Sequence, residues 1–322
     1  MFIPVLLFLL GFALLIKGGD WFVDGATGIA HRFHLPELLI GATVVSIGTT
    51  LPEVMVSVQA AMQHNSGISY GNAIGSIICN TSLIAGLTIA VSPSNAKRDT
   101  LRLPVATFFI SAAIYALIAY TSGEFQRWNG ILFLAIFVVY MVISVMQMKK
   151  SGGGNEAETQ EQEPESSPAK DLILLVIGAA AIAYGANLLV NNGTIIAAAL
   201  GVPDSVIGLT MVALGTSLPE LITAITSLMK GHSALSLGNI IGANLFNIVL
   251  VSGAAISISP FALPAEKMIM GMNSSLIIDI PVMFGVMLLL CVPALLKEKL
   301  YRWQGILLLC IYAAFTIYQF IV

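Results

Sequence analysis

The sequence predicts an all-α polytopic membrane protein in which ten transmembrane helices form two inverted repeats of five. Three observations support this prediction. The 322-residue chain is 57% hydrophobic and only 10% charged, with a mean hydropathy of +0.92, which is too apolar for a soluble domain of this size. Apolar runs of about 18 or more residues follow one another along the chain. A long motif in the first half returns in the second half.

Ten apolar segments are long enough to span a bilayer. They cover residues 2–30, 37–62, 68–92, 101–122, 128–148, 170–199, 204–229, 234–258, 274–296 and 303–321. The first and sixth are long and rich in Gly and Ala, a composition that lets helices tilt or slide against their neighbours. Residues 1–16 lack a basic start and a small-residue cleavage site, so we expect them to belong to the first span rather than to a signal peptide.

The domain organisation follows from a change of composition between the fifth and sixth spans. Residues 151–169 contain five Glu and no Lys or Arg, so they cannot bury apolar surface. We expect a first transmembrane repeat over residues 1–148, an acidic disordered linker over 149–169, and a second transmembrane repeat over 170–322.

Lys and Arg residues predict the orientation in the membrane. Eleven of them lie in loops that follow odd-numbered spans, whereas only Arg127 and Lys267 lie in loops that follow even-numbered spans. Because cytoplasmic loops carry the excess of basic residues, we expect a plasma-membrane protein with both termini outside and the acidic linker in the cytoplasm. The composition offers no basic patch for nucleic acid, so the lipid bilayer is the expected partner.

An internal repeat relates the two halves. The motif Gly-Thr-Thr-Leu-Pro-Glu that ends at Glu53 returns, 167 positions later, as Gly-Thr-Ser-Leu-Pro-Glu ending at Glu220. The same offset aligns Pro36 with Pro203, Gly41 with Gly208, Thr43 with Thr210, Asn72 with Asn239, Asn80 with Asn247 and Pro93 with Pro260. Since each half has an odd number of spans, the second half must be inverted relative to the first. Such repeats are typical of secondary transporters that bind substrate near the bilayer midplane.

The repeated motif gathers oxygen atoms around an intramembrane carboxylate. A charge in hydrocarbon costs at least a few kcal/mol, so Glu53 and Glu220 predict a functional site. A helix places hydroxyls three and four residues earlier on the same face. These hydroxyls belong to Thr49, Thr50, Thr216 and Ser217. Pro52 and Pro219 cannot donate to the preceding turn, which kinks the helix and frees backbone carbonyls. These are the ligands that a hard cation such as Ca²⁺ or Na⁺ requires.

The third and eighth spans each add a polar stripe at helical spacing. The first stripe is Asn72, Ser76 and Asn80, and its counterpart is Asn239, Ala243 and Asn247. We expect Asn72 and Asn239 to join neighbouring helices, and Asn80 and Asn247 to bind ions. Two pairs of glycines have the spacing of close helix contacts, and we expect them to bring the third span against the second and the eighth against the seventh. The pairs are Gly71/Gly75 and Gly238/Gly242.

These motifs, each followed by Gly-Asn-x-Ile-Gly-(Ser/Ala)-x-x-x-Asn, resemble the two alpha repeats of the cation/calcium antiporter superfamily and are most similar to those of prokaryotic sodium/calcium exchangers. The resemblance implies ten helices, with four ion sites between the second, third, seventh and eighth, and sliding of the first and sixth to switch access. It implies Ca²⁺ and Na⁺ as transported ions and no prosthetic group, and we expect the monomer to be the transport unit. The implied ligands are Glu53, Thr49, Thr50, Ser76, Asn80, Glu220, Thr216, Ser217, Asn247 and the backbone carbonyls of Ser46 and Ala213.

Two positions depart from that family pattern. Ala243 and Asn247 stand where the exchangers of most similar pattern carry Ser and Asp, so the midplane charge is −2, from the two glutamates. One Ca²⁺ or two Na⁺ would neutralise it, which leaves the number of Na⁺ per Ca²⁺ open. We favour a Na⁺/Ca²⁺ antiporter. The alternatives are a Ca²⁺/H⁺ antiporter with one glutamate as proton carrier, because a buried carboxyl binds protons readily, and a cation channel. No nucleophile–base pair suggests an enzyme.

The remaining polar and sulfur-containing residues receive simpler interpretations. Cys79, Cys291 and Cys310 fit no metal motif and are expected to be core or lipid-facing thiols. The four histidines fall in predicted loops and are expected at the surface. Asp20 and Asp24 share one face of the first span, where they line an entry path or, as we favour, lie near the outer interface; their repeat counterparts are Asn187 and Asn191.

Overall fold

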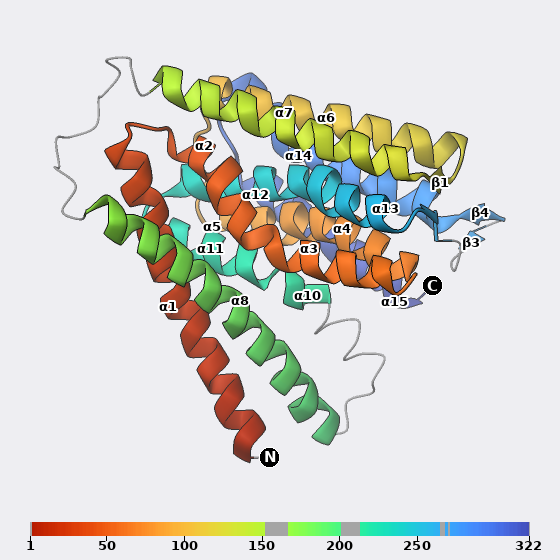
Figure 1. The fold of residues 1–322 in the computed structure, drawn as a ribbon, viewed down its shortest axis with the longest axis horizontal. Coiled ribbons are helices and arrows are strands. Elements are labelled where there is room, and N and C mark those ends of the chain that lie inside the picture. The colour runs from red at the N-terminus through yellow and green to blue at the C-terminus, as the bar shows by residue number, and fades with distance from the viewer. Residues whose placement is uncertain (1, 152–166, 201–212, 265–267, 270, 322) are drawn as a thin grey trace.

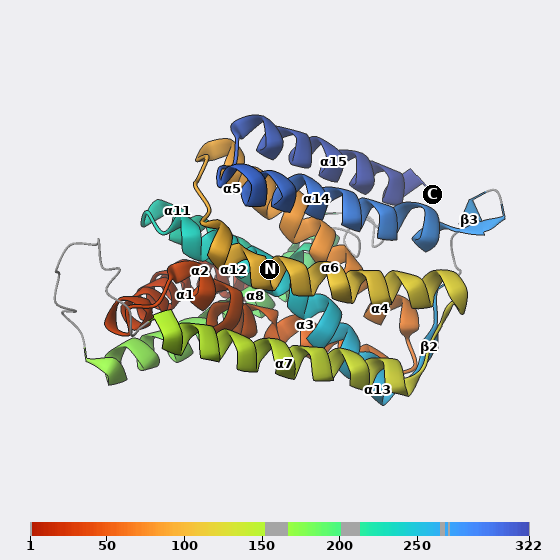
Figure 2. The same ribbon diagram turned by 90° about the horizontal axis from the view of Figure 1, so that it is seen from above.

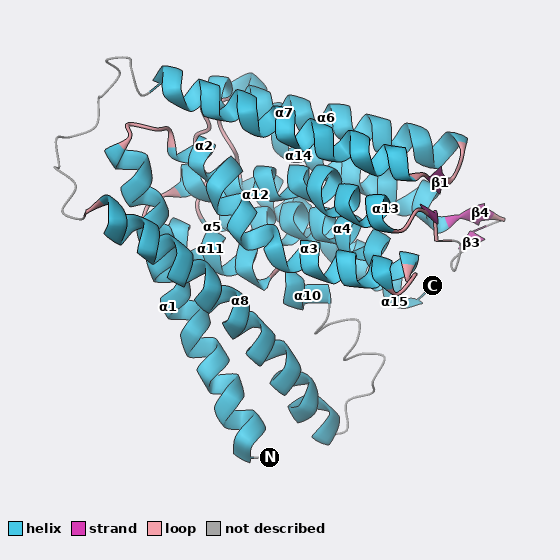
Figure 3. Cartoon of the chain, in the orientation of Figure 1, coloured by secondary structure: helices cyan, strands magenta, loops and turns pink. Residues whose placement is uncertain are grey.

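The computed structural model describes residues 2–151, 167–200, 213–264, 268–269 and 271–321. These residues are almost entirely helical, as Figure 3 shows. Eight helical segments among them are long and apolar enough to cross a membrane. The chain is therefore a polytopic helical membrane protein, as the sequence predicts.

The first half contains five helical spans, and the two short π-helical segments within them do not interrupt the helices. Its elements are α1 (Phe2–Arg32), α2 (Glu37–Ile40), η1 (Gly41–Val45), α3 (Ser46–Met62), α4 (Ser66–Cys79), η2 (Asn80–Ala85), α5 (Gly86–Val91), α6 (Arg98–Thr121) and α7 (Arg127–Ser151), where η marks a π-helical segment. The second span runs without a break from α2 to α3, and the third from α4 to α5. All five predicted spans thus coincide with helices, with ends that differ by a few residues.

The second half repeats this order. Its helices are α8 (Pro168–Ala199), α10 (Ala213–Thr216), α11 (Leu218–Met229), α12 (Ser233–Phe246), η4 (Asn247–Ser252), α13 (Gly253–Ile258), η5 (Ser275–Asp279), α14 (Ile280–Lys297) and α15 (Arg302–Ile321). The predicted seventh span begins at 204, and its first part, to residue 212, lies outside the described residues.

Four two-residue strands depart from the all-α prediction. The strand β1 (Glu124–Phe125) pairs antiparallel with β2 (Phe261–Ala262), and β3 (Met268–Ile269) pairs antiparallel with β4 (Met272–Asn273). These pairs join loops at one end of the helices (Figure 1) and leave the helical class of the fold unchanged.

The predicted acidic linker lies mostly outside the described residues, which omit 152–166. Its two ends are helical, because α7 continues to Ser151 and α8 starts at Pro168. The start of α8 is explained by Ser167, whose hydroxyl accepts a hydrogen bond from the backbone N–H of Lys170 at 3.2 Å, and by the proline that follows it.

The helices α1 and α8 lie side by side at a steep angle to the rest of the molecule (Figure 1). Glycines let their backbones touch. A Cβ at Gly11 would lie 2.8 Å from the carbonyl oxygen of Gly185, and a Cβ at Gly178 would lie 2.9 Å from that of Gly18. The 31 residues of α1 extend over about 46 Å. Because a bilayer core is about 30 Å thick, both long helices are expected to cross it with a strong tilt.

The centre of the molecule is formed by the third and eighth spans. Every residue of α12 from Leu235 to Phe246 is buried. Outer helices flank this centre, with α14 and α15 on one side and α7 on the other (Figure 2). Glycines again permit the contacts: Gly305 of α15 meets Gly86 at the start of α5, and Gly130 of α7 meets Gly253 at the start of α13.

The glycine pair of the eighth span packs differently from the prediction. Gly238 contacts the backbone of Leu38, and a Cβ at Gly242 would lie 2.6 Å from the Cα of Ala42. This glycine pair therefore holds the eighth span against the second span, whereas the contact between the eighth and seventh spans uses other residues. A Cβ at Gly71 or Gly75 would meet no described atom within 4 Å, so the contact predicted between the third and second spans does not depend on this pair.

Candidate ion-binding site

Four helices from the two halves meet around the repeated motifs. The motif helices α3 and α11 contact each other, and each also packs against the third and eighth spans, which carry the polar stripes. Figure 1 shows α3, α4 and α12 crossing in the interior of the molecule. The structure thus brings together the four spans to which the sequence assigns candidate ligands.

The first motif lies on an unbroken helix. Thr49, Thr50 and Glu53 are 2%, 0% and 0% exposed, and Pro52 sits inside α3 without ending it. Neither carboxylate oxygen of Glu53 has a hydrogen-bond partner, nor does the Thr50 hydroxyl. Ser46, at the start of α3, is buried, and its hydroxyl donates to the carbonyl oxygen of Gly41 at 2.7 Å.

The second motif lies at a helix break. The helix α10 ends at Thr216, Ser217 forms a turn with φ −87° and ψ 2°, and α11 starts at Leu218. Pro219 stands in the first turn of α11, where it needs no backbone donor. Both motifs were predicted to be kinked in the same way, but only the second is interrupted.

Polar side chains next to the break are buried without a partner, as those of the first motif are. Glu220 is fully buried, and both its carboxylate oxygens and the Ser217 hydroxyl lack a hydrogen-bond partner. Thr216 is half-buried. Ala213, whose backbone carbonyl was predicted to bind an ion, is the first residue of α10.

The two motifs face each other. The carboxylates of Glu53 and Glu220 lie close enough to interact electrostatically. The hydroxyls of Thr49 and Thr50 lie beside the Glu220 carboxylate, although neither makes a hydrogen bond of ordinary geometry to it. Residues 167 positions apart in the sequence therefore border one interior space.

The ends of the two polar stripes have matching local structure. Asn80 begins the π-helical segment η2 and Asn247 begins η4. Both side chains are fully buried, and neither their amide nitrogen nor their carbonyl oxygen has a partner. Short π-helical segments within α-helices are frequent at functional sites, because they leave backbone groups unpaired. Ser76 lies one turn before Asn80 and is 4% exposed.

Asn72 and Asn239 join helices, as predicted. The Asn72 amide donates to the backbone carbonyl of Glu53 at 3.0 Å and to the Ser57 hydroxyl at 2.8 Å. The Asn239 side-chain oxygen accepts from Thr49 at 3.1 Å. The first bond ties α4 to α3 within one half, whereas the second ties α12 to α3 across the two halves.

Sequence reasoning missed some polar groups around the site. The Asn244 amide donates to the Thr81 hydroxyl at 2.8 Å, while its buried carbonyl oxygen has no partner. Its position on α12 is off the four-residue stripe, so spacing could not reveal it. Cys79 is buried beside Ser217 and the two carboxylates, whereas Cys310 is exposed.

The electrostatics of this interior favour a bound cation. Glu53 and Glu220 carry two carboxylates in a region without solvent contact. Among the described residues, no Lys, Arg or His is buried; the other buried acid, Asp171, pairs with Arg32 at 3.2 Å. Unpaired buried charge is unfavourable, and carboxylate, hydroxyl and amide oxygens are the ligands of Na⁺ and Ca²⁺. The arrangement can therefore hold one or more hard cations.

Comparison with known proteins gives a match over nearly the whole chain. The family model described as sodium/calcium exchanger protein matches residues 3–146 and 170–321. The chain belongs to the sodium/calcium exchanger family. The resemblance seen in the motifs is thereby confirmed, and the relatives are transporters rather than enzymes.

Individual members of the sodium/calcium exchanger family support this assignment. The sodium/calcium exchanger MaX1 of Methanosarcina acetivorans is 32% identical, with 98% of each chain covered. An uncharacterized membrane protein of Methanocaldococcus jannaschii, MJ0091, is 37% identical over 95% of this chain and 94% of its own. Among solved structures, the sodium-calcium exchanger NCX_Mj soaked with Na⁺ and Sr²⁺ matches with a TM-score of 0.82 and 36% identity over 97% of each chain.

Proposed function

We propose that this protein exchanges Na⁺ for Ca²⁺ across the plasma membrane by alternating access, and that Glu53 and Glu220 bind the ions at the midplane. The observation that carries the proposal is the pair of fully buried carboxylates with no partner and no buried basic residue among the described residues. Membership of the sodium/calcium exchanger family supports the choice of ions.

Further ligands are proposed by the same criterion, namely a buried side-chain oxygen atom that has no hydrogen-bond partner in the protein. Asn80 and Asn247 meet it on both sides of the interior, as do the hydroxyls of Thr50 and Ser217. Thr49, Thr216 and Ser76, with the backbone carbonyls of Ser46 and Ala213, would complete the coordination around the two glutamates. Ca²⁺ would bind between the carboxylates, because it takes six to eight oxygen ligands.

We further propose that residues 1–148 and 170–322 are two inverted five-helix repeats joined by a cytoplasmic linker. Matching contacts support this. The offset of 167 relates Gly11 to Gly178 and Gly18 to Gly185, and the contacts run from Gly11 to Gly185 and from Gly18 to Gly178. Such reciprocal pairing is expected across a two-fold axis in the membrane plane. The basic loops favour both termini outside.

Alternating access would use the two long helices. The α1–α8 contact is built from glycines, which bring the two backbones close together and join the helices into a pair. The pair would move as a unit over the four helices of the site and open it to either side. One monomer contains all proposed parts, so we take the monomer as the transport unit.

A Ca²⁺/H⁺ antiporter is the second candidate, because the same carboxylates could bind protons. The site lacks the hydroxyl and the carboxyl that Ser and Asp would supply at Ala243 and Asn247, so two carboxylates must serve every ion. Carboxylates that are buried and unpaired bind protons more readily than exposed ones. Proton coupling would use Glu53 or Glu220 as the carrier.

Ca²⁺ uptake into proteoliposomes of the purified protein decides between these functions. One set is loaded with Na⁺ and diluted into Na⁺-free buffer, and a parallel set carries only a pH gradient. Ca²⁺ uptake that requires internal Na⁺ and does not occur with the pH gradient alone supports Na⁺/Ca²⁺ exchange. Uptake driven by the pH gradient alone would assign proton coupling, and flux that needs neither counter-ion would indicate a channel.

A further inference from the structure

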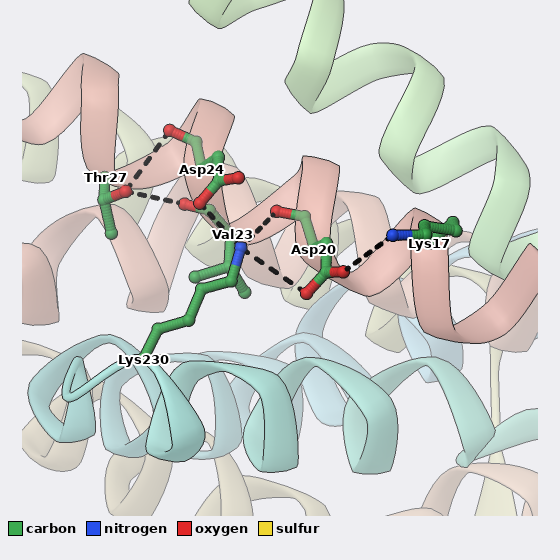
Figure 4. Close-up of polar contacts among 6 residues, drawn as sticks. All are labelled: Lys17, Asp20, Val23, Asp24, Thr27 and Lys230. Atoms are coloured by element: carbon green, nitrogen blue, oxygen red, sulfur yellow. Dashed lines mark hydrogen bonds and ion pairs between the residues drawn. The ribbon is translucent and has the colours of Figure 1, made fainter.

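Lys230, at the end of α11, is bound to two acidic residues of α1. Its ammonium group lies 2.7 Å from Oδ1 of Asp24 and 3.5 Å from Oδ1 of Asp20, and it also donates to the backbone carbonyl of Asp20 at 3.0 Å. Figure 4 shows the lysine side chain reaching across from α11 to both carboxylates. The loop charges predict that Lys230 lies on the cytoplasmic side, and its contacts with Asp20 and Asp24 favour that side for both aspartates over the expected outer interface.

The backbones of α1 and α11 approach closely beside this lysine. A Cβ at Gly19 would lie 2.7 Å from the Thr226 hydroxyl oxygen and 2.8 Å from Cγ2 of Ile222. The helix that carries Glu220 is therefore in direct contact with α1 one turn from the ion pairs. A change in the register of α1 against α11 must break or exchange the bonds of Lys230.

Asp20 and Asp24 offer Lys230 two alternative partners along α1. Asp20 and Asp24 are four residues apart, which corresponds to about 6 Å along the helix axis. The flexible lysine stem can transfer its main contact from one carboxylate to the other when α1 moves by about one turn. Lys17 lies about one turn before Asp20 on the same helix, and its ammonium group is 3.9 Å from the Asp20 carboxylate. Its positive charge repels Lys230 and so opposes movement of Lys230 past Asp20.

The ion pairs of Lys230 with Asp20 and Asp24 form a clamp between α1 and α11, and the symmetry-related positions on α8 and at the end of α3 carry no such charges. At the offset of 167, Asp20 and Asp24 correspond to Asn187 and Asn191, and Lys230 corresponds to Gln63. The amide of Asn191 donates to Asn187 on its own helix at 3.0 Å. The charged contact therefore exists on one side of the pseudo-symmetric pair, whereas the equivalent positions on the other side are neutral.

We infer that Lys230 is a positioning residue that holds α1 in register against α11 through Asp20 and Asp24, and that this one-sided clamp biases the transport cycle toward one of its two access states. The inference rests on the proposed alternating access. In an inverted repeat the two states exchange the conformations of the halves, so a bond present at only one of two symmetry-related contacts stabilises one state over the other.

The test measures the separation of α1 and α11 without ion flux. Spin labels are placed at Leu6→Cys and Met229→Cys, both exposed positions, after Cys310→Ser removes the exposed native thiol. In this background we expect Lys230→Met to enlarge a minor population, displaced by about 6 Å, by about two- to fivefold, the range for partly exposed ion pairs. Lys230→Arg should keep the parent distribution.

Two further variants separate positioning from loss of folding. The exchange Lys230→Asp with Asp24→Lys restores an opposite-charge pair and should return the distribution toward the parent. Gln63→Lys combined with Asn187→Asp and Asn191→Asp should install matching ion pairs between α8 and the end of α3. These pairs would stabilise the other access state, so we expect them to enlarge the minor population, as Lys230→Met does. Identical distributions for the parent and Lys230→Met would overturn the inference. Absence of Na⁺-driven Ca²⁺ uptake in the unmodified protein would instead refute the proposed function. The distances between the spin labels would still show whether Lys230 holds α1 in register against α11.

Discussion

The Thr49 hydroxyl of α3 donates to the side-chain oxygen of Asn239 on α12 over 3.1 Å, so the first motif is hydrogen-bonded directly to the opposite half of the molecule. Ser46 lies at the same joint, because its hydroxyl proton is shared between the carbonyl oxygen of Gly41 at 2.7 Å and that of Asn239 at 3.0 Å. The position of the Thr49 hydroxyl beside Glu220 thus depends on a residue of the eighth span.

Replacing Asn239 with Ala should weaken this joint. The change leaves the buried Thr49 hydroxyl without its acceptor, and we expect a loss of about 1 kcal/mol in the free energy of unfolding, as for other interhelical bonds in membranes. The thermal unfolding midpoint in detergent measures it. Asn95→Ala, at an exposed position, is the control and should leave the midpoint unchanged. Equal midpoints for both variants would contradict the role of Asn239.

A methyl group at Gly178 should separate α1 from α8. Its Cβ would lie 2.7 Å from the Cα of Phe22 and 2.9 Å from the carbonyl oxygen of Gly18, so backbone must move. We expect Gly178→Ala to cost about 1–3 kcal/mol of stability and to slow exchange. The control is Gly285→Ala, where the new Cβ meets no described atom within 4 Å. Normal exchange in Gly178→Ala would argue against tight α1–α8 contact in the transport cycle.

The pair Arg32–Asp171 should matter more for stability than an exposed ion pair. Both Nε and Nη2 of Arg32 lie 3.2 Å from the Asp171 carboxylate, which is almost fully buried and joins the end of α1 to the start of α8. Asp171→Asn removes the buried negative charge that Arg32 faces, and we expect a loss of about 3 kcal/mol in the free energy of unfolding. Asp99→Asn removes an exposed pair with Arg102 and should have no measurable effect. Unfolding curves that coincide for the two variants would count against this assignment.

Much of the fold could be predicted from the sequence, because apolar run length specifies where a chain can cross a bilayer. The predicted spans coincide with described helices apart from the break at Ser217 in the seventh span, and residues 204–212 lie outside the description. Helix neighbours were less predictable. Gly238 and Gly242 were assigned to a contact with the seventh span but contact the second, since glycine spacing identifies a close contact without identifying its partner.

The burial of the two glutamates of the candidate site could be predicted from the sequence, but the local shape of the second motif could not. Burial of Glu53 and Glu220 follows from their apolar surroundings, and their shared interior follows from the repeat. The break at Ser217, absent from the matching Thr50, could not be foreseen, because both motifs carry the same proline. Lys230 was counted only as a loop charge, since its partners Asp20 and Asp24 lie more than 200 positions away in the sequence.

The most direct test of the central claim is Na⁺-driven uptake of radiolabelled Ca²⁺ by proteoliposomes that contain Glu53→Gln or Glu220→Gln. Each change keeps the side-chain shape and removes one of the two buried negative charges. The account predicts that both variants lose Na⁺-dependent uptake, while Glu124→Gln, an exposed control, retains it. Near-normal uptake in either folded variant would contradict the proposal that these two carboxylates bind the transported ions.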